Sequence, residues 1–191
     1  MSLHPAQNRG LRELYAMTRQ LIRHWSALGP RFAGTDAIDV LEDGVERARA
    51  LLADLAPLTE QRDLYGYPAA QGVGASIALT RLGVTDRFLE RNQALRTAVI
   101  DVQHVVTLLA YQAELARTGE DENLAEMLRR HENQLLAVER AARRAATKLG
   151  RDPDYAIEPL DTGPVGRAAH GVQYAVGSVG EWFDRRRGKS G

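Results

Sequence analysis

The feature that most constrains the fold is a long stretch without proline or glycine, which runs from Asp86 to Thr118. Thr85 or Asp86 can serve as the N-cap, because a side-chain oxygen there can accept a hydrogen bond from a backbone amide of the first turn. Gly119 suits the other end, because glycine tolerates the positive φ that often closes a helix. The pattern therefore predicts one long helix over residues 86–118.

The apolar residues of this stretch form two stripes along the predicted helix. A helix with apolar residues on two sides must be covered on both sides. We therefore expect residues 86–118 to form a central helix with other helices packed around it. The first stripe consists of Phe88, Leu95, Val99, Val102, Val106, Leu109 and Ala113, and the second of Leu108, Tyr111 and Leu115.

Helical spacing of apolar residues recurs along the rest of the chain, and no segment shows the alternation of a half-buried strand or a βαβ rhythm. Residues 11–28 should pair as an antiparallel hairpin with a helix that starts at residue 36 and stops at Pro57. Residues 86–118 should pair with residues 121–149 around Gly119. The sequence thus predicts an all-α bundle of about six helices, over residues 11–28, 36–56, 69–83, 86–118, 121–149 and 164–187.

The length of 191 residues is enough for one well-buried core, and nothing in the sequence requires two. We therefore expect a single helical domain over residues 1–191. Residues 150–163 are rich in proline and irregular in pattern, so they should form a connector between helices. Residues 185–191 should be a flexible basic tail.

Composition excludes several classes of function. Charged residues make up 26% of the chain and balance to a net charge of zero, so no global attraction to nucleic acid or to an anionic membrane is built in. The chain has no cysteine, which excludes disulfides, thiolate metal sites and a cysteine nucleophile. No segment approaches the run of about 18 uncharged apolar residues that a membrane span needs. The amino terminus lacks the pattern of a secretory signal, so we expect a cytoplasmic protein.

Glycines inside two predicted helices suggest a surface for close helix packing. An interior glycine costs about 1 kcal/mol relative to alanine, so something must hold these helices together. Residues 69–73 also echo residues 168–172. Gly72 in the first segment, and Gly171 and Gly177 in the second, would let another backbone approach closely. The packing could be within one subunit or between subunits, and the sequence leaves both open.

Aromatic residues outside the predicted core are further candidates for binding. Tyr65 and Tyr67 lie in an irregular segment, and aromatic residues of this kind are enriched at binding hot spots. Trp182 and Phe183 precede the basic cluster of residues 185–189, which could contact phosphates or the surface of a membrane. A solvated tail explains this cluster as well, because cations are favourable after the C-terminus of a helix.

Asp101, His104 and His131 form the sharpest polar constellation. Asp101 and His104 are three residues apart and share a helix face, and a hairpin around Gly119 would bring His131 close to them. Two histidines and a carboxylate can hold a divalent metal. The alternative interpretation is that each histidine is buried and satisfied by an aspartate or a backbone carbonyl. Di-iron bundles repeat Glu-x-x-His on two helices, whereas the spacing occurs here once and with aspartate.

Residues 77–89 resemble the helix-turn-helix phrase, in which a glycine turn separates two short helices. Asn92 occupies a position where the motif requires an apolar residue. Glu90 lies beside Arg87 and Arg91, so the attraction of the second helix to phosphates would be weak.

No catalytic or cofactor signature is present: the sequence has no GxSxG elbow, no P-loop and no dinucleotide fingerprint. We therefore expect no cofactor and a non-catalytic bundle that acts through contact with copies of itself or with another protein. The first alternative is a helical enzyme that binds a metal or small ligand at Asp101, His104 and His131. The second is a DNA-binding regulator.

Overall fold

The computed structural model describes residues 4–61, 89–161 and 163, and these form an all-α structure. The four long helices are α1 (Pro5–Leu28), α2 (Asp36–Gln61), α4 (Arg91–Thr118) and α5 (Glu122–Leu149). A 3-10 turn, η1 (Gly29–Phe32), follows α1, and the four-residue helix α6 (Pro153–Ala156) follows α5. Within the described ranges there is no β-strand, so the predicted fold class is confirmed.

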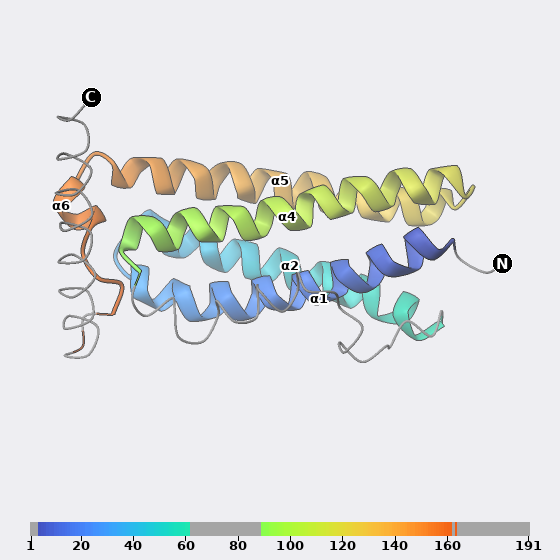
Figure 1. Ribbon diagram of the computed structural model, residues 1–191, viewed down its shortest axis with the longest axis horizontal. Helices are drawn as coiled ribbons and strands as arrows, with labels where there is room; N and C mark the ends of the chain where they lie inside the picture. Colours follow the sequence, from blue (N-terminus) through green and yellow to red (C-terminus); the bar gives the residue numbers. More distant parts are fainter. Residues whose placement is uncertain (1–3, 62–88, 162, 164–191) are drawn as a thin grey trace, which may run out of the picture.

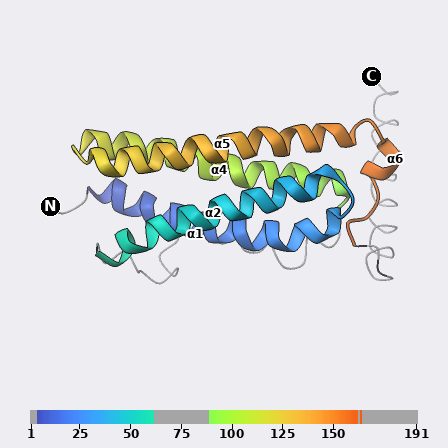
Figure 2. The ribbon, with the colours of Figure 1, turned by 180° about the vertical axis from the view of Figure 1, so that it is seen from behind.

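The four long helices form a four-membered ring in which every helix has two neighbours. α1 packs against α2 and α4, and α5 packs against α4 and α2. Figures 1 and 2 show that all four lie along one axis and that each helix runs antiparallel to both of its neighbours. The two expected hairpins, α1 with α2 and α4 with α5, are both present. α2 and α4 therefore occupy opposite corners of the ring. The two hairpins meet along an α1–α4 interface and an α2–α5 interface.

The central position expected for residues 86–118 is not confirmed, and the helix begins later than predicted. α4 starts at Arg91, and its N-cap is Glu90, which forms a capping box with Gln93. The later start has a physical cause: Leu89 accepts a hydrogen bond from the backbone of Leu160 at 2.9 Å. This extended pairing takes residues 89 and 90 out of the helix. α4 occupies a corner of the ring like the other three long helices, and Ile100 on its outer side is 60% exposed.

The predicted stop at Gly119 is correct, although positive φ occurs one residue later. Glu120 has φ of 59°. The backbone amide of Asp121 donates to the carbonyl of Ala116 at 2.9 Å, and that of Glu120 donates to Arg117 at 3.1 Å. These two bonds make a Schellman ending, in which the residue after the C-cap must be left-handed.

The prediction that Pro57 ends the second helix is wrong, because α2 continues to Gln61 with the proline inside it. Leu55, just before the proline, is fully buried, and Leu58, just after it, packs against the core. Burial on both sides of the proline holds this turn helical. α1 also extends beyond its predicted range, since it begins at Pro5, and proline is well suited to a first turn.

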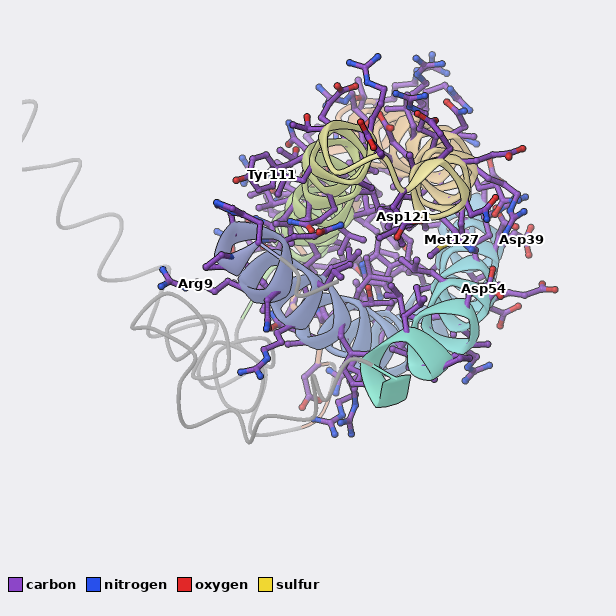
Figure 3. All side chains as sticks on the ribbon, turned by 90° about the vertical axis from the view of Figure 1, so that its right-hand side faces the viewer. Arg9, Asp39, Asp54, Tyr111, Asp121 and Met127 are labelled. Atoms are coloured by element: carbon purple, nitrogen blue, oxygen red, sulfur yellow. The ribbon has the colours of Figure 1, made fainter. Side chains whose placement is uncertain are left out.

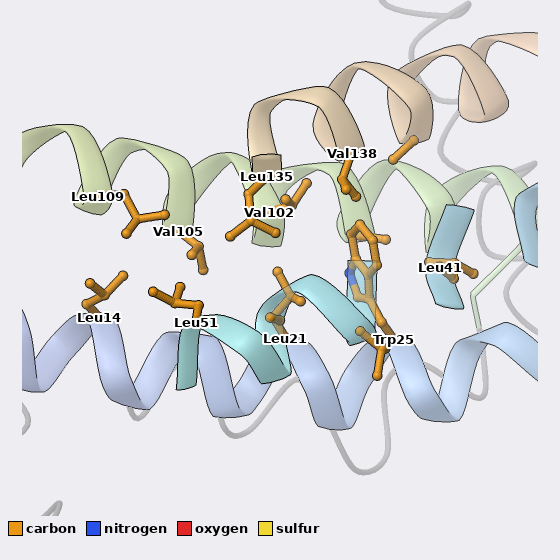
Figure 4. Packing of buried hydrophobic residues seen from close by; sticks show 14 of the residues in the cluster. Leu14, Leu21, Trp25, Leu41, Leu51, Val102, Val105, Leu109, Leu135 and Val138 are labelled. Carbon is orange, nitrogen blue, oxygen red and sulfur yellow. The ribbon is translucent and has the colours of Figure 1, made fainter. Parts of the chain in front are cut away.

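Trp25 is the largest buried side chain of the core. Figure 4 shows its ring projecting from α1 into the space between the four helices, near Leu21 and Val138. The ring is accommodated because Gly44 of α2 faces it: a Cβ atom added to Gly44 would lie 2.2 Å from Trp25 Cζ3. The other fully buried large side chains include Leu11, Leu14, Leu41, Leu51, Leu95, Leu109, Leu128 and Leu135.

The connector after α5 closes one end of the bundle. Residues 150–161 contain α6 and are otherwise irregular, and Leu160 is buried. Arg91 holds this segment in place: its guanidinium lies 4.5 Å from the centroid of the Tyr155 ring and donates to the carbonyl of Arg31 at 3.0 Å. The predicted helices over 69–83 and 164–187 and the basic tail of 185–191 lie outside the described residues.

Replacing Gly44 with alanine should lower the free energy of unfolding by about 1–3 kcal/mol, measured by urea denaturation. The added Cβ would overlap the fully buried Trp25 ring, and Val138 Cγ1 lies 3.1 Å away on the other side. This overlap should outweigh the gain of about 1 kcal/mol in helix propensity. Gly29→Ala is the matched control, because a Cβ there meets nothing within 4 Å. An equal or higher stability of Gly44→Ala would show that the close contact is not there.

Candidate functional site

The polar residues singled out by the sequence lie at the two interfaces between the α1–α2 hairpin and the α4–α5 hairpin. At the α1–α4 interface, His24 Nδ1 is hydrogen-bonded to Asp101 Oδ2. The side chain of His24 is 5% exposed and that of Asp101 is 18% exposed. The helical spacing of α1 explains this burial, because His24 lies on the same face as Leu21 and Leu28. The pair therefore joins the two hairpins inside the protein.

The α2–α5 interface carries a second histidine–carboxylate pair. His131 Nε2 lies 2.8 Å from Asp54 Oδ2, and Arg130 Nη2 lies 3.2 Å from the same oxygen. The His131 side chain is 4% exposed, whereas that of Asp54 is 45% exposed at the edge of the bundle. The hydrogen bond from His131, with the positive charges of His131 and Arg130, holds the pKa of the Asp54 carboxyl below its usual value, while partial burial opposes this effect.

His104, the remaining residue of the predicted metal constellation, lies on the surface. Its Nε2 atom is 3.4 Å from Glu13 Oε1 of α1, and both side chains are about half exposed, at 49% and 52%. An ion pair this open contributes little to stability. It is nevertheless the third histidine–carboxylate pair, among the described residues, that crosses from one hairpin to the other.

The structure does not bring Asp101, His104 and His131 together. Asp101 and His104 turn toward α1, whereas His131 turns away from α4 toward α2. No group of three or more histidine, aspartate or glutamate side chains able to hold a metal ion occurs in the part of the chain that the structure describes. Each of the three residues has a different partner: Asp101 pairs with His24, His104 with Glu13 and His131 with Asp54. His131 is buried beside an aspartate, as in the alternative interpretation, whereas His104 is half exposed.

The chemistry open to these pairs is limited by burial. A histidine oriented by a carboxylate can act as a general base only where the imidazole also reaches the proton to be removed. His24 and His131 are 5% and 3% exposed, so neither ring is accessible to a substrate from solvent. The arrangement is therefore suited to coupling the helices.

Gln112 is a buried polar residue of α4 that the sequence analysis did not identify. It is fully buried, and neither its side-chain oxygen nor its nitrogen has a hydrogen-bond partner among the described residues. The amide packs directly on the backbone of α1, since a Cβ added to Gly10 would lie 1.8 Å from Gln112 Nε2. Gly10 thus permits a close approach of α1 and α4.

The outer face of α4 presents apolar side chains to solvent. Ile100 is 60% exposed and Tyr111 is 52% exposed, and Figure 3 shows Tyr111 on the outward side of the ring. Tyr111 belongs to the second apolar stripe predicted from the sequence, whereas Leu108 and Leu115 of that stripe are half-buried. The residues of this surface, termed here the α4 outer face, are Arg96, Ile100, Gln103, Thr107, Tyr111 and Glu114, all of them exposed.

The other candidate sites cannot be placed. The predicted interaction residues lie outside the described residues, and of the helix-turn-helix phrase only Leu89 is described, in extended conformation. None of the helices that the structure describes is long and apolar enough to cross a membrane. The interaction residues in question are Tyr65, Tyr67, Gly72, Gly171, Gly177, Trp182 and Phe183.

Comparisons with protein-family models, with curated proteins and with solved structures find no match to this chain.

Three of the residues that matter in the structure were missed, although the sequence carried a signal for each. His24 follows Leu21 by three residues and precedes Leu28 by four, and Gln112 follows Leu109 by three, so helical spacing places both on a core face. Gly44 is a glycine inside a predicted helix. The argument for close packing that was made for the glycines of residues 69–83 and 164–187 applies to it equally.

Acid should remove the contribution of Asp54 to stability. A carboxyl whose pKa is lower in the folded than in the unfolded state stabilises the fold above its unfolded pKa, and this stabilisation is lost as the pH falls through the folded pKa. Asp54→Asn should therefore lower the free energy of unfolding by about 0.2–1 kcal/mol near pH 6. The difference from the wild type should shrink between pH 5 and pH 2, measured by urea denaturation.

Asp39→Asn is the control for this series, because Asp39 is an exposed aspartate of the same helix with no ion pair to another described residue. It lies in the first turn of α2, so its own pH dependence measures what the helix dipole contributes without an ion pair. Figure 3 shows Asp39 and Asp54 on the same side of the bundle. If the Asp54→Asn difference stays constant across the acid range, the carboxylate of Asp54 does not stabilise the α2–α5 interface.

Replacing Gln112 with methionine should raise the free energy of unfolding by about 1–3 kcal/mol, because it removes a buried amide that lacks a partner and keeps a chain of similar length. Thermal and urea unfolding would both measure the change. Gln103→Met, at an exposed position of α4, should have almost no effect on the isolated chain. A clear loss of stability in Gln112→Met would mean that the amide makes a bond that the fold needs.

Proposed function

We propose that this protein is a non-catalytic helical bundle that acts through protein–protein contact, and that the α4 outer face makes the contact. The single observation that carries the proposal is the exposure of Ile100 and Tyr111 on one face of one helix. They are two of three large hydrophobic side chains that are exposed among the described residues, and the third, Ile157, belongs to the connector.

The spacing of these two residues supports a continuous surface. Ile100 and Tyr111 are eleven residues apart, which is about three turns of α-helix, so both project on the same side. Tyrosine is enriched at binding hot spots because it combines a large apolar ring with a hydroxyl group. A partner that covered this face would remove both side chains from water.

The interior of the bundle supports the non-catalytic part of the proposal. The buried histidines His24 and His131 are engaged with Asp101 and Asp54, and both rings are closed to solvent. These pairs join helix to helix. Within the described ranges, by contrast, no residue of the α4 outer face is hydrogen-bonded or ion-paired to the α1–α2 hairpin, so a partner there would leave the junction of the two hairpins intact.

A photo-crosslinking amino acid in place of Tyr111 would test the proposal in the cells from which the chain comes. We expect covalent adducts at position 111, because a partner on the α4 outer face would lie within reach of the probe. The same probe at Arg49, an exposed residue of α2 at the opposite corner of the ring, should give none. Equal labelling at both positions, or none at position 111, would contradict the proposal.

A further inference from the structure

The α4 outer face is complementary to itself when it is read in the reverse direction: apolar residues fall opposite apolar ones, polar opposite polar, and the positive end opposite the negative end. A positive end, Arg96, is followed by Ile100 and then Gln103, and a negative end, Glu114, is preceded by Tyr111 and then Thr107. The two halves are equidistant from a point near residue 105. If two copies of α4 lay antiparallel about that point, Arg96 would face Glu114.

We propose that the partner of the α4 outer face is a second copy of this chain, with the two α4 helices antiparallel about a two-fold axis near residue 105. The inference rests on the proposed function, because it names the partner of that same face. In such an isologous contact each pair occurs twice. Ile100 of one copy packs on Tyr111 of the other, Gln103 lies opposite Thr107, and Arg96 lies opposite Glu114.

The apolar pairs form the inner part of this interface and the charged pairs form its two ends. Between residues 96 and 114 the helix rises about 27 Å, at about 1.5 Å per residue. Ile100 and Tyr111 lie about 8 Å on either side of the axis on the same scale. An apolar centre with a charged rim is the usual arrangement of an interface.

The charges on the monomer are placed so that the ends can pair. Arg96 contacts only Asn92 of its own helix, through Nη2 at 2.9 Å to Asn92 Oδ1, in the described part of the chain. Glu114 is 57% exposed and is already bound by Arg117 and, at 3.4 Å, by Arg129. Arg96 of the second copy would therefore be the third cation near Glu114. Because Glu114 is already paired, this contact adds little affinity, and its main effect is to fix the register of the two helices. A single helix face is also a small interface, so the dimer should be weak and dependent on concentration.

Charge reversal gives a direct test, with mass measured by sedimentation equilibrium from about 1 µM to about 500 µM. The wild type should shift toward twice the 21.1 kDa of the chain as the concentration rises. Arg96→Glu places glutamate opposite Glu114 at both ends, and Glu114→Arg places arginine opposite Arg96, so each variant alone should dimerise at least tenfold more weakly. Arg49→Glu, on α2, should leave the dimer unchanged.

Mixing the two variants separates register from folding. In a heterodimer of Arg96→Glu with Glu114→Arg, opposite charges face each other at both ends, so the mixture should associate at least as strongly as the wild type. Circular dichroism of each variant alone shows whether it remains folded. A wild type that stays monomeric, or a mixture that associates no better than its components, overturns the antiparallel pairing.

The crosslinking probe at position 111 distinguishes failure of this inference from failure of the proposed function. A chain–chain adduct, mapped by mass spectrometry to the segment around Ile100, supports the antiparallel pairing. An adduct to a different protein overturns the pairing and leaves protein contact through the α4 outer face intact. The absence of any adduct overturns both.

Discussion

The contact of the Trp25 ring with the backbone of α2 is the constraint on which the bundle depends. Trp25 extends from α1, Gly44 gives it room on α2, and Val138 of α5 closes the same space. A residue with any side chain at position 44 would force α1 and α2 apart, or push the ring toward α5. Because interiors are packed as densely as organic crystals, such a change would spread to neighbouring layers. The spacing of three of the four long helices is thus set at one level of the core.

The histidine–carboxylate pairs affect a different property, namely which helix of one hairpin packs against which helix of the other. The loss of hydration on burying a histidine ring offsets much of the hydrogen bond that it gains, so these pairs contribute little net stability. Breaking one leaves a polar group buried without a partner, which costs much more. We infer that His24 with Asp101, and His131 with Asp54, penalise wrong docking of the two hairpins. Each pair forms only when α1 meets α4 and α2 meets α5 in the observed register.

The local sequence pattern predicted most of the described helices correctly. It failed at helix ends whose position depends on residues that are distant in the sequence. Helical spacing and end signals predicted the hairpin of α4 and α5, including the stop at Gly119, because these depend on neighbouring residues. The predicted start of α4 is too early because it depends on Leu160, about 70 residues further along the chain. The backbone amide of Leu160 donates to the carbonyl of Leu89, which keeps residues 89 and 90 extended, so the helix starts at Arg91. Local preference predicts a stop at Pro57, because proline disfavours the interior of a helix. The burial of Leu55 and Leu58, which keeps this turn helical, depends on tertiary packing.

The candidate metal residues show the same limit at the level of side chains. The hairpin geometry that was assumed for Asp101, His104 and His131 is correct, since α4 and α5 are antiparallel neighbours. Each helix of the ring has a second neighbour, however, and the sequence does not say which neighbour a polar side chain will face. Asp101 found His24 on α1, and His131 found Asp54 on α2. A site formed by the α4–α5 hairpin alone cannot be predicted from the sequence, because each of its helices also packs against a helix of the other hairpin.

The exposed apolar residues of α4 result from its position at a corner of the ring, where it packs against α1 and α5. A helix at the corner of a four-membered ring has about half of its surface against two neighbours, and α4 fills that half with Leu95, Val102, Leu109 and small residues. Of its second apolar stripe, Leu108 and Leu115 are half-buried and Tyr111 is exposed, and Ile100, which belongs to neither predicted stripe, is exposed beside it. Burying a large apolar side chain contributes about 1.5–3 kcal/mol, and Ile100 and Tyr111 do not gain this free energy while they are exposed in the isolated bundle. The side of α4 that faces away from α1 and α5 is therefore the surface on which burial by a partner would release this free energy.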